Sequence, residues 1–188
     1  SLVHVAIMMS RQTILEKLIK LNADINSLYH NGHSVLTLSC KYSTPEIVKT
    51  VLENYTNINH KDEKSYTAFI HACIYKKTGQ DEKEYLINKF NIIELLISYD
   101  ANINHTDNNN FNGLFHFYTS YVKYNLNNLK DEAKSILTSL TIMSDTSCLD
   151  EIMLLTIINE DLWMFQVLEM KRDKNKSYNN IFLEMLDS

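Results

Sequence analysis

The chain has 188 residues, of which 45% are hydrophobic and 22% are charged, as in a folded domain or a short repeat array. Its net charge of −5 disfavours sequence-independent binding to nucleic acid, which needs clustered Lys and Arg. The longest apolar runs, such as residues 152–158, are far shorter than the ~20 residues that cross a bilayer, so we expect no membrane segment. No secretory leader is visible, and three cysteines without framework spacing indicate a reducing compartment, so we expect a cytoplasmic protein.

One phrase recurs along the chain, as LNADIN at residues 21–26, YTNINHKD at residues 55–62 and YDANINHTD at residues 99–107. A second set of phrases, SLVHVA, SVLTLS, TAFIHA and NGLFHF, begins at positions 1, 34, 67 and 112, so its spacing is 33 twice and then 45. A period of 33 is that of ankyrin repeats, and the last spacing is one such period with a short insertion. The chain resembles the ankyrin repeat family: SLVHVA stands where the family has Thr-Pro-Leu-His-x-Ala, and residues 14–26 match its second helix and the following loop. The resemblance implies units of a β-turn followed by two antiparallel helices.

The apolar pattern supports such helix pairs. Each expected first helix carries a small residue at the same place (Ala6, Ser39 and Ala72), which lets neighbouring helices approach closely. Each second helix carries apolar residues three and four positions apart, which form one inward stripe. A single unit cannot bury this stripe alone, so the units must stack. The stripes are Ile14, Leu15, Leu18 and Ile19; Ile47, Val48, Val51 and Leu52; and Ile92, Ile93, Leu96 and Ile97.

The match weakens beyond residue 120. Residues 132–143 are predicted to form the second helix of a fourth unit, residues 150–158 and 159–170 the helix pair of a fifth, and residues 179–186 a further helix. The sequence therefore predicts an all-α ankyrin-repeat solenoid of about five units in a single array. The expected units are residues 1–33, 34–66, 67–111, 112–144 and 145–188.

Two neighbouring units carry inserted segments. The gaps from Ala72 to the stripe at Ile92 and from Phe117 to the stripe at Ile136 are each more than twice the corresponding gap in the first two units. Because apolar residues keep helical spacing through both insertions, we predict that the second helices of the third and fourth units are extended backward by roughly two turns. These extensions would form a ridge, residues 78–90 and 121–133, opposite the β-turn tips. The ridge either serves only to bury one extension against the other or contacts a partner.

No metal, cofactor or catalytic site is expected. Zinc needs converging ligands, whereas the histidine spacing follows the repeat, so His60 and His105 would lie one unit apart, at about 8–10 Å. Cys40 and Cys73 occupy the same position in adjacent units and are interpreted as small core residues. No nucleophile has a local signature, and no glycine-rich loop could hold a phosphate.

The resemblance implies that a partner protein meets the turn tips and the exposed side of the first helices. Aromatic residues there are the strongest candidates because they dominate interface energetics; the alternative is that each only covers its neighbour in the stacked turns. Asp62 and Asp107 stand at the turn-closing Asp of the family and are interpreted as structural. The candidate partner-binding residues are His30, Asn31, His33, Lys41, Tyr42, Glu63, Lys64, Tyr66, Tyr75, Asn108, Asn109 and Phe111.

Two functions remain open. The first is a monomeric, non-catalytic module that binds another protein through its concave turn and first-helix face. The second is a segment of a larger enzyme or effector that recruits a substrate or packs against a catalytic domain. The composition, rich in Asn, Ile and Lys, is similar to that of ankyrin proteins of large DNA viruses and intracellular bacteria, which suggests the host cytoplasm as a location.

Overall fold

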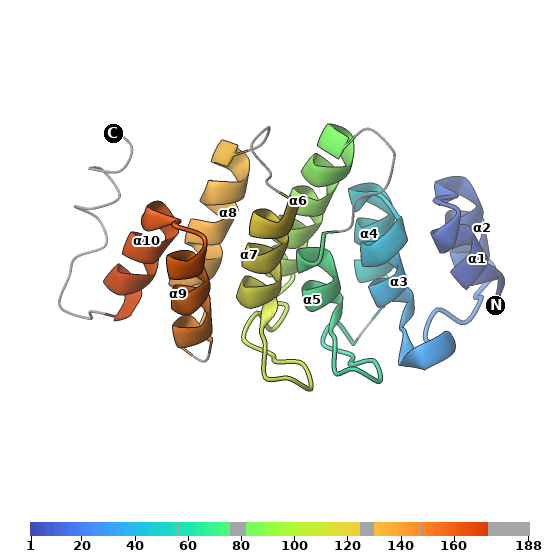
Figure 1. Cartoon of the computed structure of the whole chain (residues 1–188). Coiled ribbons are helices and arrows are strands. Elements are labelled where there is room, and N and C mark those ends of the chain that lie inside the picture. Colours follow the sequence, from blue (N-terminus) through green and yellow to red (C-terminus); the bar gives the residue numbers. More distant parts are fainter. Residues whose placement is uncertain (56, 76–81, 125–129, 147, 173–188) are drawn as a thin grey trace.

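The computed structural model describes residues 1–172 except residues 56, 76–81, 125–129 and 147. Within these residues the chain forms α-helices and one short 3-10 turn, and no strand (Figure 1). In the same part of the chain, none of the helices is long and apolar enough to cross a membrane. The helices are α1 (Leu2–Met8), α2 (Gln12–Lys20), α3 (Val35–Tyr42), α4 (Pro45–Leu52), α5 (Ala68–Cys73), α6 (Glu82–Ser98), α7 (Gly113–Tyr124), α8 (Lys130–Met143), α9 (Leu149–Ile158) and α10 (Leu162–Arg172), and the 3-10 turn η1 is His30–Gly32.

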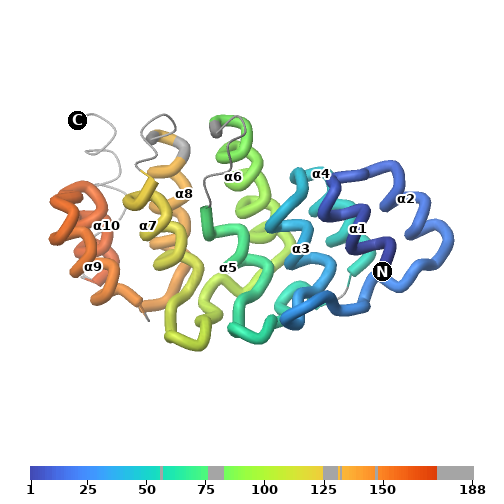
Figure 2. Tube along the Cα trace, turned by 45° about the vertical axis from the view of Figure 1, so that its right-hand side comes forward, coloured from blue at the N-terminus to red at the C-terminus, as the bar shows by residue number. Residues whose placement is uncertain are grey.

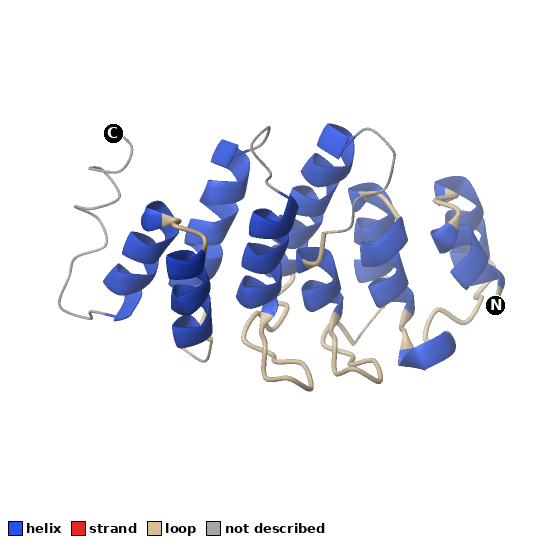
Figure 3. Ribbon diagram, viewed as in Figure 1, coloured by secondary structure: helices blue, strands red, loops and turns tan. Residues whose placement is uncertain are grey.

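Consecutive helices pair, and the pairs stack side by side in two layers (Figures 1 and 2). Helices α1, α3, α5, α7 and α9 pack against one another in one layer, and α2, α4, α6, α8 and α10 form the other. Long loops before α5 and α7 project from one edge of the stack (Figure 3). This arrangement confirms the predicted all-α solenoid of stacked helix pairs. The further helix predicted at residues 179–186 lies outside the described residues.

The predicted inward stripes form the core between the layers. In α4 the stripe residues Ile47, Val48 and Val51 are at most 1% exposed. In α2, by contrast, Leu15 is fully buried while Ile14 is 51% exposed, because the first pair packs against a neighbouring pair on one side only. Burial of each stripe therefore depends on the units on both sides of it.

Close contact between first helices explains one departure from the family pattern. Gly113 stands where the family has proline, and a Cβ atom there would lie 2.4 Å from Cε1 of Phe69. Such a distance is far inside van der Waals contact, so the approach of α7 to α5 requires glycine. Helices α3 and α5 also lack the proline of the family, and side-chain caps stabilise their first turns. Ser34 and Thr67 accept hydrogen bonds from backbone N–H groups of α3 and α5, respectively.

The insertion in the third unit extends its second helix, as predicted. Helix α6 begins at Glu82, ten residues before Ile92, whereas α4 begins two residues before Ile47. The apolar residues Leu86 and Phe90 of this extension are buried.

The insertion in the fourth unit is divided between two helices. Helix α8 begins six residues before Ile136, which gives an extension of about one turn, and the residues where a second turn was predicted lie outside the described residues. Helix α7 runs seven residues beyond Phe117, whereas α3 ends three residues beyond Ser39, so the first helix takes up part of the insertion. The extended ends of α6 and α8 rise at the edge opposite the loops, where the ridge was predicted (Figure 1). Part of that predicted ridge, residues 78–81 and 125–129, lies outside the described residues.

Candidate functional site

The turns that precede the first helices are closed by buried aspartates. Oδ1 of Asp62 accepts hydrogen bonds from the backbone N–H groups of Lys64 and Tyr66, both at 2.9 Å. Oδ1 of Asp107 accepts equivalent bonds from Asn109 and Phe111, at 2.8 and 3.0 Å. The aspartates thus have the turn-closing role predicted from the sequence.

Each turn also contains a residue in the left-handed backbone region. This residue is Gly32 in the first turn, with a φ of 72°, Ser65 in the second, with a φ of 61°, and Asn110 in the third, with a φ of 65°. Glycine and asparagine tolerate this region better than most residues do. The turn geometry is therefore preserved although the sequence at this position changes.

Successive turns are joined into one continuous edge by backbone hydrogen bonds. The N–H of Glu63 donates to the carbonyl oxygen of Asn31 at 3.1 Å, and the N–H of Asn108 donates to that of Lys64 at 3.3 Å. The amide Nδ2 of Asn108 adds a bond to the carbonyl oxygen of Glu63 at 3.2 Å. The tips therefore hold fixed positions relative to one another.

Six of the predicted partner-binding residues are exposed along this edge, and among them Glu63 is acidic and Lys64 is basic. A seventh, Tyr42, lies at the end of α3 and is 53% exposed. Beside it, the half-buried Lys41 places its Nζ 5.4 Å from the centroid of the Tyr42 ring. We call the exposed set the turn-tip surface. It consists of His30, Asn31, Tyr42, Glu63, Lys64, Asn108 and Asn109.

Tyr75 does not belong to this surface, and the prediction that it is exposed is wrong. Its side chain is 6% exposed and packs between the rings of Tyr85 and Tyr124, with centroid distances of 5.4 and 4.6 Å. Tyr85 belongs to the extension of α6 and Tyr124 to the extension of α7. The inserted segments therefore cover a residue that the repeat position alone would leave exposed.

Tyr66 and Phe111 are half-buried and match the alternative that aromatic residues cover their neighbours. The ring of Tyr66 lies edge-on to His71 and His116, with centroid distances of 5.2 and 5.3 Å. Phe111 stacks on Phe115 at 3.8 Å. Tyr66 therefore joins two neighbouring units, whereas Phe111 covers the first turn of α7 in its own unit.

The structure also brings together a cluster that the sequence analysis missed, formed by His33, Asp62 and His71. Nε2 of His71 donates to Oδ2 of Asp62 at 2.8 Å. Nδ1 of His33 lies 3.1 Å from the same oxygen but is not aligned for a hydrogen bond. The signal in the sequence was the spacing of nine residues between Asp62 and His71, which recurs between Asp107 and His116.

Burial sets the protonation of this cluster. It lowers the pKa of His71 to about 4 despite the favourable bond to Asp62. It also lowers the pKa of His33, an effect to which the nearby charge of Lys41 contributes. Burial would raise the pKa of Asp62, but hydrogen bonds from His71 and the turn backbone outweigh it and hold this pKa below its usual value. At neutral pH the cluster therefore consists of one carboxylate and two neutral imidazoles.

Cys40 and Cys73 are fully buried thiols in the first-helix layer, as expected of small core residues. Burial raises the pKa of Cys40 to about 12 and raises that of Cys73 further. Thiols with such pKa values are poor nucleophiles.

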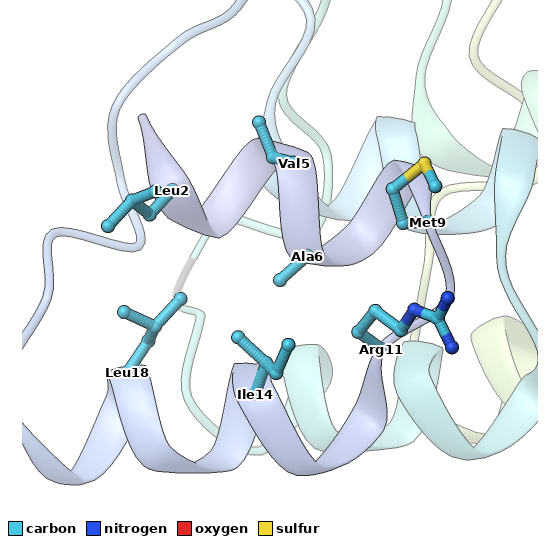
Figure 4. Close-up of a pocket in the computed structure, with 7 residues that line it drawn as sticks. All are labelled: Leu2, Val5, Ala6, Met9, Arg11, Ile14 and Leu18. Carbon is cyan, nitrogen blue, oxygen red and sulfur yellow. The ribbon is translucent and has the colours of Figure 1, made fainter.

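A different surface lies at the N-terminal pair. Side chains of α1 and α2 line an open apolar pocket between the two helices (Figure 4). Leu2 and Met9 are 72% and 60% exposed there. In repeat arrays, apolar faces of this kind are normally buried by a neighbouring unit.

Comparisons with known proteins agree with this architecture. A family model of ankyrin repeats in three copies matches residues 3–107. The chain is also similar to the putative ankyrin repeat protein L371 of Acanthamoeba polyphaga mimivirus, with 31% identity over 119 residues, which are 60% of this chain. The matched region covers 14% of the length of that relative. Ankyrin repeats are in general protein–protein interaction modules, and this chain belongs to the ankyrin repeat family.

Proposed function

We propose that the chain is a non-catalytic module that binds another protein through the turn-tip surface. The observation that carries this proposal is the continuous edge of hydrogen-bonded tips, which presents exposed polar side chains. The exposed ring of Tyr42 belongs to the same first-helix layer but lies at the opposite end of α3 from the tips. A surface whose backbone is already ordered loses little conformational entropy when it binds. An exposed tyrosine supplies a large contact area with few rotatable bonds.

The half-buried members of the predicted set have a supporting role in this proposal. His33, Tyr66 and Phe111 make contacts within the stack of turns, so their substitution would disturb the turns themselves. A test of binding must therefore change only side chains that point away from these contacts.

A suitable triple variant is Tyr42→Ala, Lys64→Ala and Asn109→Ala. The matched control changes the same residue types in the second-helix layer, at Tyr99, Lys49 and Asn91, all of which are exposed. Wild type and both variants would be used to capture proteins from host-cell lysate, after circular dichroism has verified their folds. We expect the turn-tip variant to lose a protein that the wild type and the control variant retain. Equal retention by all three proteins would contradict the proposal.

The second candidate is a segment of a larger protein that packs against another domain or recruits a substrate for it. The apolar pocket between α1 and α2 favours this role, since exposed apolar groups gain free energy when covered (Figure 4). A Leu2→Gln, Met9→Gln variant would separate the two candidates. Loss of capture in this variant, with retention by the turn-tip variant, would favour packing through the pocket.

We also propose that the partner is a cytoplasmic protein of a host cell. The similarity to a protein of a virus that infects an amoeba supports this source. The buried thiols of Cys40 and Cys73 are compatible with a reducing compartment. Mass spectrometry of proteins captured from amoebal lysate would test it, and capture of secreted proteins alone would contradict it.

A further inference from the structure

We propose that His33, Asp62 and His71 form a binding site for one divalent transition-metal ion of the zinc type, separate from the turn-tip surface. One ligand atom from each residue, Nδ1 or Nε2 of the histidines and a carboxylate oxygen of the aspartate, lies within 4.8 Å of the other two. Imidazole nitrogen and carboxylate oxygen are preferred zinc ligands, and three protein ligands leave a fourth position for water. Among the described residues, this is the group of three whose geometry suits an ion.

The spacing of the three atoms is close to that of a metal site. Oδ2 of Asp62 lies 2.8 Å from Nε2 of His71 and 3.1 Å from Nδ1 of His33. Ligands about 2.0–2.2 Å from a tetrahedral ion are separated by roughly 3.3–3.5 Å. The two nitrogen–oxygen separations therefore need to widen by only a few tenths of an ångström, while the two histidine nitrogens, which lie within 4.8 Å of each other, adjust by side-chain rotation.

Burial and the bonding of the turn favour this site. The side chains of Asp62, His71 and His33 are 2%, 9% and 13% exposed. The backbone N–H groups that bond to Oδ1 fix the carboxylate and leave Oδ2 between the two imidazoles. Such second contacts orient a ligand and raise metal affinity. Nδ1 of His33 is buried 3.1 Å from Oδ2 of Asp62 without an aligned hydrogen bond, so an ion would give this nitrogen a directed contact.

The protonation state suits metal binding as well. The lowered pKa values of both histidines keep their imidazoles neutral, which is the form that ligates a metal. Asp62 remains ionised and offsets part of the charge of the ion.

The positive charge of Lys41 opposes binding of a metal ion at this site. Its Nζ lies 3.1 Å from Nε2 of His33, the other nitrogen of that ring. When Nδ1 binds a metal, the ring proton is on Nε2, so the ammonium group must turn away. The half-buried lysine therefore lowers the affinity without closing the site. Glu63 is the other charged residue that acts on His33, and its negative charge favours the ion.

The next turn provides an internal comparison. Nε2 of His116 lies 3.0 Å from Oδ2 of Asp107, as in the proposed site, but Tyr66 takes the position of His33. The ring centroids of Tyr66 and His116 are 5.3 Å apart, as are those of His33 and His71. Burial, Asp107 and Asp62 raise the pKa of the Tyr66 hydroxyl, so this phenol is not a ligand at neutral pH. The third turn thus has the same hydrogen bond without a third ligand.

The test is calorimetric titration of the chelator-treated chain with zinc chloride, with cobalt(II) absorption as a second readout of ligand geometry. We expect one equivalent of zinc to bind to the wild type. Asp62→Asn should weaken binding at least about tenfold, while its amide oxygen still closes the turn. The matched control Asp107→Asn should leave the affinity unchanged. Lys41→Met should tighten binding severalfold, because it removes a positive charge next to the ligand.

Two further variants keep the test decisive. His33→Gln removes a half-buried ligand and should weaken binding even if Asp62→Asn proves poorly folded by circular dichroism. Tyr66→His should create a second equivalent with Asp107 and His116. The proposal is overturned if the wild type binds no zinc, or if zinc binds equally to the wild type, Asp62→Asn and His33→Gln. Absence of zinc binding would mean that the cluster serves only as a hydrogen-bonded part of the turns. Equal binding in the variants would mean that other histidines bind the zinc.

Discussion

Tyr42 and Tyr75 stand one repeat period apart, at the same position of adjacent units, and they have opposite environments. Tyr42 ends α3 and is 53% exposed, whereas Tyr75 follows α5 and is 6% exposed. The difference arises from the third and fourth units, whose extended helices α6 and α7 place Tyr85 and Tyr124 against the second tyrosine. The repeat position thus selects the face of the solenoid, and the inserted segments decide whether a side chain on that face meets solvent.

Truncation of each tyrosine is the strongest test of this difference. Tyr75→Ala should lower the free energy of unfolding by about 3–5 kcal/mol, because it leaves a cavity between three elements. Tyr42→Ala should change it by less than about 0.5 kcal/mol, because the ring is half exposed. Urea denaturation followed by circular dichroism measures both values. Similar losses in the two variants would mean that the inserted segments do not cover Tyr75.

A second contrast concerns His71, which occupies the position of Leu38 in the preceding unit. The folded-state pKa of His71 is lowered to about 4, so the unfolded chain binds the proton more readily. The contribution of a neutral His71 is therefore fully present above about pH 6.5 and is lost as the pH falls toward 4, by up to about 3 kcal/mol.

Urea denaturation between pH 4 and 7 measures this dependence. His71→Leu, which copies the preceding unit, should flatten the profile in that range. An unchanged profile in His71→Leu would show that other groups, such as His116, cause the loss.

A third test compares the packing of the first helices. Gly113→Ala should cost about 1–3 kcal/mol, because the added methyl group overlaps the ring of Phe69. The preceding unit has Ala68 at the same position, so a methyl group is tolerated there. The double variant Gly113→Ala, Phe69→Leu should recover part of the loss. If Gly113→Ala is neutral in thermal denaturation, the contact between α5 and α7 is looser than described.

The smallest changes in stability are expected for substitutions in the turns. Asn110→Ala should cost about 1 kcal/mol, because alanine adopts the left-handed region less readily than asparagine does. Gly32→Ala should have a similar cost for the same reason, since its Cβ would have ordinary contacts. Asn109→Ala is the control, with an exposed side chain and no positive φ, and it should change stability little. Thermal denaturation measures these changes, and equal losses for Asn109→Ala and Asn110→Ala would contradict this explanation.

Much of the fold could be predicted because it is repeated locally. The regular repeat period, the stripes on α4 and α6 and the turn-closing role of Asp62 and Asp107 all follow from short-range patterns. Apolar residues keep helical spacing through the insertion of the third unit, so the extension of α6 was also predictable. In the fourth unit the same spacing was compatible with a longer first or second helix, and only the packing of α7 and α8 divided the insertion between them.

The candidate site was less predictable. The exposed tips followed from the repeat register, but the burial of Tyr75 depended on helices that lie elsewhere in the sequence. The cluster of His33, Asp62 and His71 combines residues from two turns and a helix. The spacing of Asp62 and His71 recurs in the next unit, but the approach of His33 from the preceding turn depends on the stacking of the units.

The sequence by itself determined that this protein is a stack of helix pairs with aspartate-closed turns, because each of those features is set by residues a few positions apart. Only the tertiary structure decided which of two equivalent tyrosines is exposed and which histidines meet an aspartate. Those outcomes depend on contacts between neighbouring units, and such contacts form only when the whole array has stacked.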